Sequence, residues 1–166
     1  VTVTRITPED GSFIHTFFDV CPWSPSGRYL LCLRLPFQDR PPGPDDKADV
    51  CIIDLEEQTI ETIYTTTGWG MQVGAHQVWG RTDRYVYFND KQDGIPVGVQ
   101  FDLERGTARI LEGPIYQVSP YETFALAPLM YGRMNSLFPG YDVTVDPDLE
   151  EKAVNDDAAE GALWRV

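Results

Sequence analysis

One segment of the chain returns further along it with its aromatic and basic residues in the same order. Residues 21–32 read CPWSPSGRYLLC and residues 77–88 read QVWGRTDRYVYF, so a Trp, an Arg and a Tyr fall at matching places. A third, weaker copy at 117–126, QVSPYETFAL, keeps a Ser-Pro turn and the apolar strand after it. Repeats with a period of roughly 40 to 55 residues are typical of propellers and solenoids. The repeat therefore restricts the chain to a repeat architecture.

Each clear copy has the pattern of four short strands. The repeated segment is two strands joined by a tight polar turn, which is the chemistry of a β-hairpin. A third strand, a turn and a fourth strand follow, and we expect these strands at 50–56 and 60–64 in the first copy and at 97–104 and 108–111 in the second. Asp54 and Asp102 stand where the third strand meets its turn, which suits Asp because its carboxylate bonds nearby backbone N–H groups. No window has the periodicity of an amphipathic helix.

The pattern predicts an all-β chain, a β-propeller of four-stranded antiparallel blades. A single twisted blade cannot bury both faces, so blades pack against one another around a channel. We expect one partial propeller domain over 1–166, with blade 1 at about 13–66, blade 2 at about 74–112 and an incomplete blade 3 at about 114–166 that carries a long acidic insertion at 131–161. About two and a half blades are fewer than the roughly four to eight of a closed ring, so the ring is expected to be incomplete.

Two sets of residues are interpreted as core rather than as a site. Aromatic side chains at matching places of the repeat are expected to pack between blades; they are Trp23, Trp79, Tyr29 and Tyr85. The three cysteines have no metal-like spacing. Cys32 and Cys51 fall on strands that should be neighbours, and we favour packed, reduced thiols over a bond between them.

The chain is strongly acidic, with a net charge of -13 and a pI near 4.4. That balance argues against binding to nucleic acid, which depends on many Lys and Arg contacts to phosphate, and against binding to anionic membranes. No apolar run is long enough to span a bilayer. The sequence leaves the cellular compartment open.

The propeller geometry selects candidate site residues. In each blade, the loop leading into the first strand and the loop between the second and third strands meet at one mouth of the channel. Both histidines, His15 and His76, lie in such lead-in loops. His76 is the candidate catalytic base, because it follows a glycine-rich loop and imidazole has a pKa near neutral pH. The alternative is a structural His that holds the loop through hydrogen bonds.

Polar and basic residues of the same loops are the candidate substrate-binding residues. They are His15, Arg34, Arg40, Gln72, Asn89, Lys91 and Arg133. The basic members would pair with an anionic sugar, and the alternative is that they form exposed ion pairs with neighbouring carboxylates. The acidic stretch 146–160 is interpreted as a solvated loop; a calcium site there is the weaker alternative, because the spacing and the glycine of an EF-hand are absent.

Residues 15–29 and 72–90 resemble the propellers of oligogalacturonate lyases and of some ulvan lyases, within the wider TolB-like and WD40-like group. The resemblance covers the two clear blades. Its Ser-Pro-x-Gly-Arg turn indicates only the fold, whereas the Gln-x-Gly-Ala segment ahead of Trp79 is more particular. The resemblance implies β-elimination on uronic-acid glycans with a His base, often joined by Tyr and Arg. It also implies, for the oligogalacturonate enzymes, a divalent metal held by His and Gln; His76 and Gln72 match by position, and the other ligands would lie outside this chain.

Two functions follow from these observations. The first is a lyase that acts on an acidic oligosaccharide or polysaccharide. The alternative is a non-catalytic TolB-like or WD40-like propeller that binds a protein or a glycan on its upper face. The two differ in one respect that can be measured, because only the lyase forms an unsaturated product.

Overall fold

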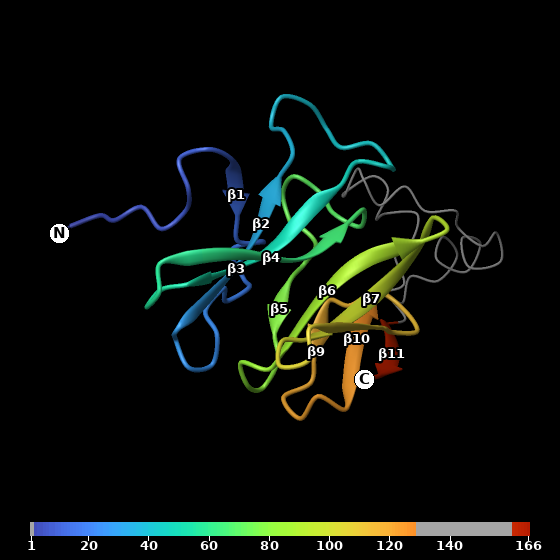
Figure 1. Ribbon diagram of the computed structural model, residues 1–166. Coiled ribbons are helices and arrows are strands. Elements are labelled where there is room, and N and C mark those ends of the chain that lie inside the picture. Colours follow the sequence, from blue (N-terminus) through green and yellow to red (C-terminus); the bar gives the residue numbers. More distant parts are fainter. Residues whose placement is uncertain (1, 129–160) are drawn as a thin grey trace.

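The computed structural model describes residues 2–128 and 161–166, and their regular structure is entirely β (Figure 1). They form three antiparallel sheets with the strand orders β1-β2-β3-β4, β5-β6-β7-β8 and β11-β10-β9, called here sheets 1, 2 and 3. The strands are β1 (Ser12–Ile14), β2 (Tyr29–Leu35), β3 (Ala48–Asp54), β4 (Thr59–Thr66), β5 (Val78–Trp79), β6 (Tyr85–Gln92), β7 (Ile95–Asp102), β8 (Thr107–Ile110), β9 (Gln117–Val118), β10 (Phe124–Pro128) and β11 (Gly161–Arg165). The prediction of an all-β chain with four-stranded antiparallel sheets is confirmed.

The same polar turn closes the first hairpin of all three sheets. In each, the first turn residue donates its backbone N–H to the carbonyl of the residue five places on: Ser24 to Tyr29, Gly80 to Tyr85 and Ser119 to Phe124, at 2.9, 2.8 and 2.8 Å. The weak third copy therefore has the turn of the two clear ones. The repeat positions the residues before each turn at equivalent places in the three sheets.

An Arg–Asp pair ties this turn to the turn between the third and fourth strands. Arg28 Nη2 lies 2.6 Å from Asp54 Oδ2, and Arg84 Nη2 lies 2.7 Å from Asp102 Oδ2. The other oxygen of each aspartate accepts two backbone N–H groups of its own turn, from Glu56 and Glu57 in sheet 1 and from Glu104 and Arg105 in sheet 2. The predicted bonding of these two aspartates to nearby backbone is confirmed.

These ties predict that the fold loses stability in acid. Hydrogen bonds from Arg28 and Arg84 lower the pKa of Asp54 and of Asp102 below the ordinary 3.8. A carboxyl whose pKa is lower in the folded state stabilises the fold above its unfolded pKa, and the contribution disappears as the pH falls through the folded pKa. We expect the urea midpoint to fall as the pH is lowered below about 4. The Asp54→Asn, Asp102→Asn double variant should show a shallower decline, and an equal decline would contradict this account.

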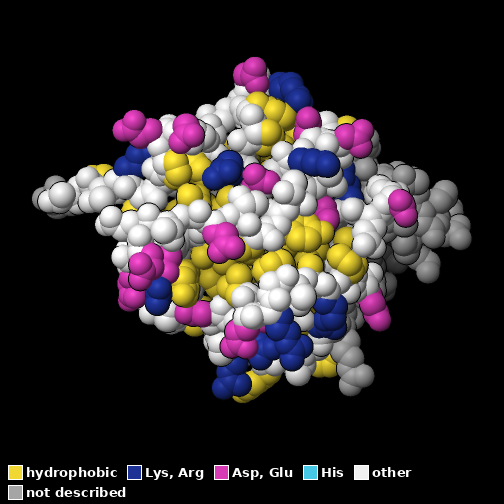
Figure 2. Space-filling model, viewed as in Figure 1, with side chains coloured by type: hydrophobic (Ala, Val, Ile, Leu, Met, Phe, Trp, Pro, Cys, Tyr) yellow, Lys and Arg dark blue, Asp and Glu magenta, His cyan; other side chains and the backbone are white. Residues whose placement is uncertain are grey.

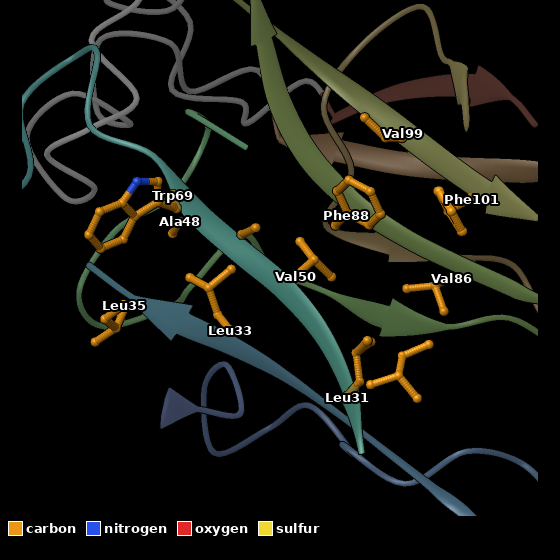
Figure 3. Close-up of a cluster of buried hydrophobic side chains, with 12 residues drawn as sticks. Leu31, Leu33, Leu35, Ala48, Val50, Trp69, Val86, Phe88, Val99 and Phe101 are labelled. Atoms are coloured by element: carbon orange, nitrogen blue, oxygen red, sulfur yellow. The ribbon is translucent and has the colours of Figure 1, made fainter. Parts of the chain in front are cut away.

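Sheets 1 and 2 pack face to face through the larger apolar core (Figure 3). Leu31, Leu33 and Val50 come from sheet 1, and Phe88 and Val99 come from sheet 2. Their alternation along each strand places every second side chain in this core, as the two-residue period of a strand requires. The indole of Trp69, in the loop after β4, closes one end of the core and donates its Nε1–H to the carbonyl of Asp46 at 2.8 Å.

A second core lies between sheets 2 and 3. It contains Tyr87 of β6, Ala125 of β10, and Leu111 and Ile115 from the segment that joins the two sheets. Strand β6 is therefore buried on both faces, with Phe88 toward sheet 1 and Tyr87 toward sheet 3. That explains why its first four residues, 85–88, form a continuous apolar run rather than an alternation.

Of the two repeated Trp residues, only Trp79 packs between sheets. It lies against the larger core, and its Nε1–H donates to the carbonyl of Pro22 in sheet 1 at 2.9 Å. Trp23 is 50% exposed, so the prediction that it packs between blades is wrong. Trp23 pairs with Leu30, whose side chain points to the face of sheet 1 away from sheet 2, and no described sheet covers that face. Tyr29 and Tyr85 pack against the two cores as predicted.

Cys32 and Cys51 face each other across β2 and β3 as buried free thiols. A hydrogen bond from Cys32 lowers the pKa of Cys51 to about 7, and the same bond raises the pKa of Cys32. The predicted burial of these two cysteines is confirmed, whereas Cys21 is exposed, so its interpretation as a core residue is wrong.

Candidate functional site

The loop between β4 and β5 folds tightly and ends at His76. Gly70 and Gly74 exchange two backbone hydrogen bonds of 3.0 and 2.9 Å, and Gly74 adopts a φ of 60°, which glycine reaches without a steric penalty. His76 has a φ of 51°, a region in which His is found more often than most residues. Its N–H donates to the carbonyl of Val73 at 3.1 Å. The loop thus holds His76 by its backbone at the start of β5.

The imidazole of His76 is 8% exposed and lies against Tyr116. The two rings are stacked, with centroids 4.7 Å apart and planes inclined by 21°. Nε2 is 2.6 Å from the backbone carbonyl oxygen of Tyr116. Because a carbonyl only accepts, Nε2 carries the proton, and the lone pair of the neutral ring is on Nδ1. Nδ1 has no hydrogen-bond partner among the described residues, so its lone pair is the one that a substrate proton could meet.

The hydroxyl of Tyr116 extends the cluster to a third loop. It donates to Asp19 Oδ2 at 3.2 Å. Asp19 belongs to the loop that precedes Trp23 in sheet 1, His76 to the loop that precedes β5, and Tyr116 to the segment that precedes β9. One loop from each of three successive sheets therefore reaches the same cluster, which is called here the Asp19–His76–Tyr116 cluster; the loop of sheet 1 follows β1, and the other two precede the first strand of their sheets.

The environment sets the protonation states that this cluster needs for acid–base chemistry. Burial lowers the pKa of His76, because desolvation disfavours the imidazolium, so the ring is neutral at neutral pH. The negative charge of Asp19 raises the pKa of Tyr116, so the phenol keeps its proton. A neutral imidazole and a protonated phenol in contact are a base and an acid at the same place.

Sequence reasoning missed Tyr116. The third copy of the repeat begins at Gln117, and the sequence predicted no role for the residue before it. The signal was available, because Tyr116 precedes the strand residue Val118 much as His76 precedes Trp79, both within a lead-in loop. The predicted substrate-binding residue Asn89 lies near the cluster, where it is buried and hydrogen-bonded to Ile115.

The predicted basic residues of the rim are engaged within the chain. Arg40 makes two hydrogen bonds to Asp46, at 2.6 and 2.9 Å, and its guanidinium lies 3.7 Å from the centre of the Phe37 ring. Arg34 lies 3.9 Å from Asp49, and Lys91 Nζ donates to the carbonyl of Pro44 at 2.7 Å. The hydrogen bond from Arg40 lowers the pKa of Asp46 to about 2. On the face seen in Figure 2, Lys and Arg side chains lie among Asp and Glu side chains.

Gln72 and Arg40 come together in a shallow pocket of about 400 Å³. Its other lining residues are Gln38, Asp39, Pro41, Pro42 and Met71. The pocket combines these polar groups with two prolines and a methionine, and most of its exposed surface is apolar. His15 is exposed just beyond β1, so the prediction that it lies in a loop leading into the first strand is wrong. Arg133 lies outside the described residues.

The described residues do not fit the divalent metal that the resemblance implies. Within 2–128 and 161–166 there is no group of three or more His, Cys, Asp or Glu side chains that could hold an ion. Nε2 of His76 points its proton at a carbonyl, and Gln72 is an exposed residue of the separate pocket. No step below runs through a metal.

Comparisons with known proteins place no further constraint on this site. No protein-family model matches the chain, and no curated protein matches it. In the described part of the chain, no helix is long and apolar enough to cross a membrane. The function is therefore argued from the Asp19–His76–Tyr116 cluster alone.

Proposed function

We propose that the three sheets are consecutive blades of a β-propeller. Three features support the proposal: the sheets stack face to face in chain order, each begins with the same hairpin, and the Arg–Asp tie recurs in sheets 1 and 2. One loop from each sheet reaches the same place, as the loops at one end of a propeller would. The blades correspond to about 13–66, 74–112 and 114–166.

We further propose that the chain belongs to a lyase that cleaves uronic-acid glycans by β-elimination. His76 Nδ1 takes the proton from the carbon beside the sugar carboxylate, the bond between the next carbon and the glycosidic oxygen breaks, and the Tyr116 hydroxyl gives its proton to that leaving oxygen. The electron pair of the broken C–H bond becomes the new double bond. The observation that carries the proposal is the Nε2–H bond to the Tyr116 carbonyl, which commits the ring to the tautomer with a basic Nδ1 beside a protonated phenol.

Asp19 completes the proposed site through the Tyr116 hydroxyl. Its carboxylate accepts the phenolic hydrogen bond and so orients the acid. It also favours the imidazolium that forms when His76 takes a proton, since opposite charges attract. This division of roles between a base, an acid and an orienting carboxylate is common in general acid–base catalysis.

One observation favours the alternative, a non-catalytic propeller that binds a protein or a glycan. An anionic substrate needs cations, yet Arg34 and Arg40 already lie beside carboxylates of the chain. Displacing an internal partner reduces the gain from a new ion pair. The pocket of Gln72 and Arg40 would then offer amide and carboxylate groups to a neutral hydroxyl-bearing ligand.

Incubating the chain with oligogalacturonate distinguishes the two functions. The lyase predicts a steady rise in the ultraviolet absorbance of an unsaturated product together with binding measured by calorimetry. Binding without any absorbance change over long incubation would support the alternative and contradict the lyase. Absence of both binding and product with acidic oligosaccharides would contradict the proposed substrate class.

A further inference from the structure

Asn89 bonds to the residues that immediately precede both rings of the cluster. It lies in the middle of β6 and is 3% exposed. Its side-chain Nδ2 donates to the carbonyl of Ile115 at 2.8 Å, and its Oδ1 accepts the Ile115 N–H at 2.7 Å. Its backbone N–H donates to the carbonyl of Ala75 at 2.8 Å. Hydrogen bonds from this one residue of β6 therefore fix the backbone at Ala75 and at Ile115.

The side chain of Asn89 makes the two hydrogen bonds to the backbone of Ile115 that a neighbouring strand would otherwise make. Ile115 lies in the connection between β8 and β9, so no strand pairs with its backbone N–H and carbonyl. A carboxamide of this length supplies one donor and one acceptor side by side, which a backbone peptide needs and which neither Asp nor Ala can provide. Without the Asn89 side chain, the backbone N–H and carbonyl of Ile115 would lose their hydrogen-bond partners. Because unpaired buried backbone groups are costly, the loop around Ile115 would shift until water reached them.

The two rings do not fix their own position in the molecule. Ring stacking and the Nε2–H hydrogen bond join His76 to Tyr116. Both contacts form only if the backbones of the two residues are held at the right distance from each other. Apolar packing of the Ile115 side chain anchors the same loop against sheet 2, yet it sets no direction for hydrogen bonds.

We infer that Asn89 is a positioning residue that sets the contact between His76 and Tyr116, rather than a residue that touches substrate. Its part in catalysis rests on the proposed lyase function, whereas its part in the geometry does not. Asn89 and the next residue, Asp90, then have two different structural roles. Asn89 holds the loop before β9, and Asp90 accepts hydrogen bonds from Tyr64 and Thr66 of β4 at 2.8 Å each.

Proton and nitrogen NMR of the histidine rings tests the inference without any assay of activity. The chain has two histidines, so exposed His15 serves as an internal reference. In the unaltered chain we expect an Nε2-protonated His76 with ring protons shifted upfield by the stacked Tyr116. In Asn89→Ala, the upfield shift should collapse and the Nε2–H signal should exchange rapidly. A folded Asn89→Ala protein with unaltered His76 signals would overturn the inference.

Tyr87→Phe is the matched control. Tyr87 lies two residues before Asn89 on the same face of β6 and loses a buried hydroxyl that bonds to Glu122 and Gln100, but it does not touch Ile115 through hydrogen bonds. Its His76 signals should stay as in the unaltered chain. Asn89→Asp is the second variant, because it keeps the shape and replaces the donor with a carboxylate oxygen that faces the Ile115 carbonyl. If neither Asn89 variant folds while Tyr87→Phe does, Asn89 holds the sheets together and the positioning role is wrong.

Kinetics then connects the geometry to the proposed reaction. Since a misplacement of about 1 Å can cost on the order of 10²-fold in rate, we expect kcat of Asn89→Ala to fall by roughly 10- to 100-fold with KM nearly unchanged. A rise in KM with kcat unchanged would indicate a substrate contact and contradict the positioning role. If the NMR result holds but the unaltered chain forms no product, the lyase proposal fails and the role of Asn89 in the geometry stands.

Discussion

Replacing His76 with Asn should lower kcat/KM for an acidic oligosaccharide by roughly 10²- to 10⁴-fold, the usual contribution of a general base. Asn suits the left-handed backbone of position 76, so the loop should persist, although its shorter amide does not reach the Tyr116 carbonyl as Nε2 does. What Asn lacks is a basic nitrogen. The decrease should therefore be in kcat, measured as the rate at which the unsaturated product forms and followed by its ultraviolet absorbance.

His15→Asn provides the comparison for that experiment. It removes the other histidine, which is exposed just beyond β1 and lies outside the Asp19–His76–Tyr116 cluster. We expect kcat to stay within a factor of about two of the unaltered chain, and a role of His15 in substrate binding would change KM instead. Equal kcat values in His76→Asn and the unaltered chain would exclude His76 as the base. The pH profile adds a check: activity should fall in acid as His76 becomes protonated, at a pH below the ordinary 6.5 because burial lowers its pKa.

Replacing Phe88 with Ala should destabilise the fold by about 3–5 kcal/mol. Phe88 is fully buried in the core between sheets 1 and 2, and its ring lies 4.9 Å from that of Tyr64. The residues around it come from both sheets, so they cannot collapse into the cavity without moving one sheet. Because small domains are stable by only about 5–15 kcal/mol, this loss is a large share of the total. Urea unfolding followed by circular dichroism measures it.

Phe18→Ala is the matched control for Phe88. Phe18 is 83% exposed, and its substitution should change the free energy of unfolding by no more than about 0.5 kcal/mol. A loss of less than about 1 kcal/mol in Phe88→Ala would mean that the two sheets do not pack through this core. Similar losses in both variants would contradict the assignment of one ring to the interior and the other to the surface.

The repeat predicted the strands well because it reports backbone geometry. A hairpin depends on its own turn residues, and the same turn follows Trp23, Trp79 and Val118. Burial was harder to predict, since it depends on what lies against a face. Trp23 and Trp79 occupy equivalent places, yet sheet 1 covers Trp79 and no described sheet covers Trp23.

The candidate site was predicted in part. The lead-in loops pointed to His76, and the structure places it beside two residues from other loops. Tyr116 was missed because its contact with His76 joins two loops that are distant in sequence. Such a contact depends on how the sheets pack, and the sequence of one segment does not predict that packing. For Arg34 and Arg40 the structure shows the alternative that the sequence left open, ion pairs with carboxylates of the chain, because the folding of 40–46 lets Arg40 reach Asp46. Asn89 was found, but its amide faces a backbone and not a ligand.

Product analysis in water enriched in heavy oxygen tests the proposed elimination at the Asp19–His76–Tyr116 cluster most directly. Elimination adds no water, so mass spectrometry should find unsaturated products without the heavy isotope, and these should disappear in His76→Asn. Saturated products, heavier than the unsaturated ones by one water that carries the heavy oxygen, would indicate hydrolysis and contradict the proposed reaction. Intact substrate after binding would contradict catalysis altogether.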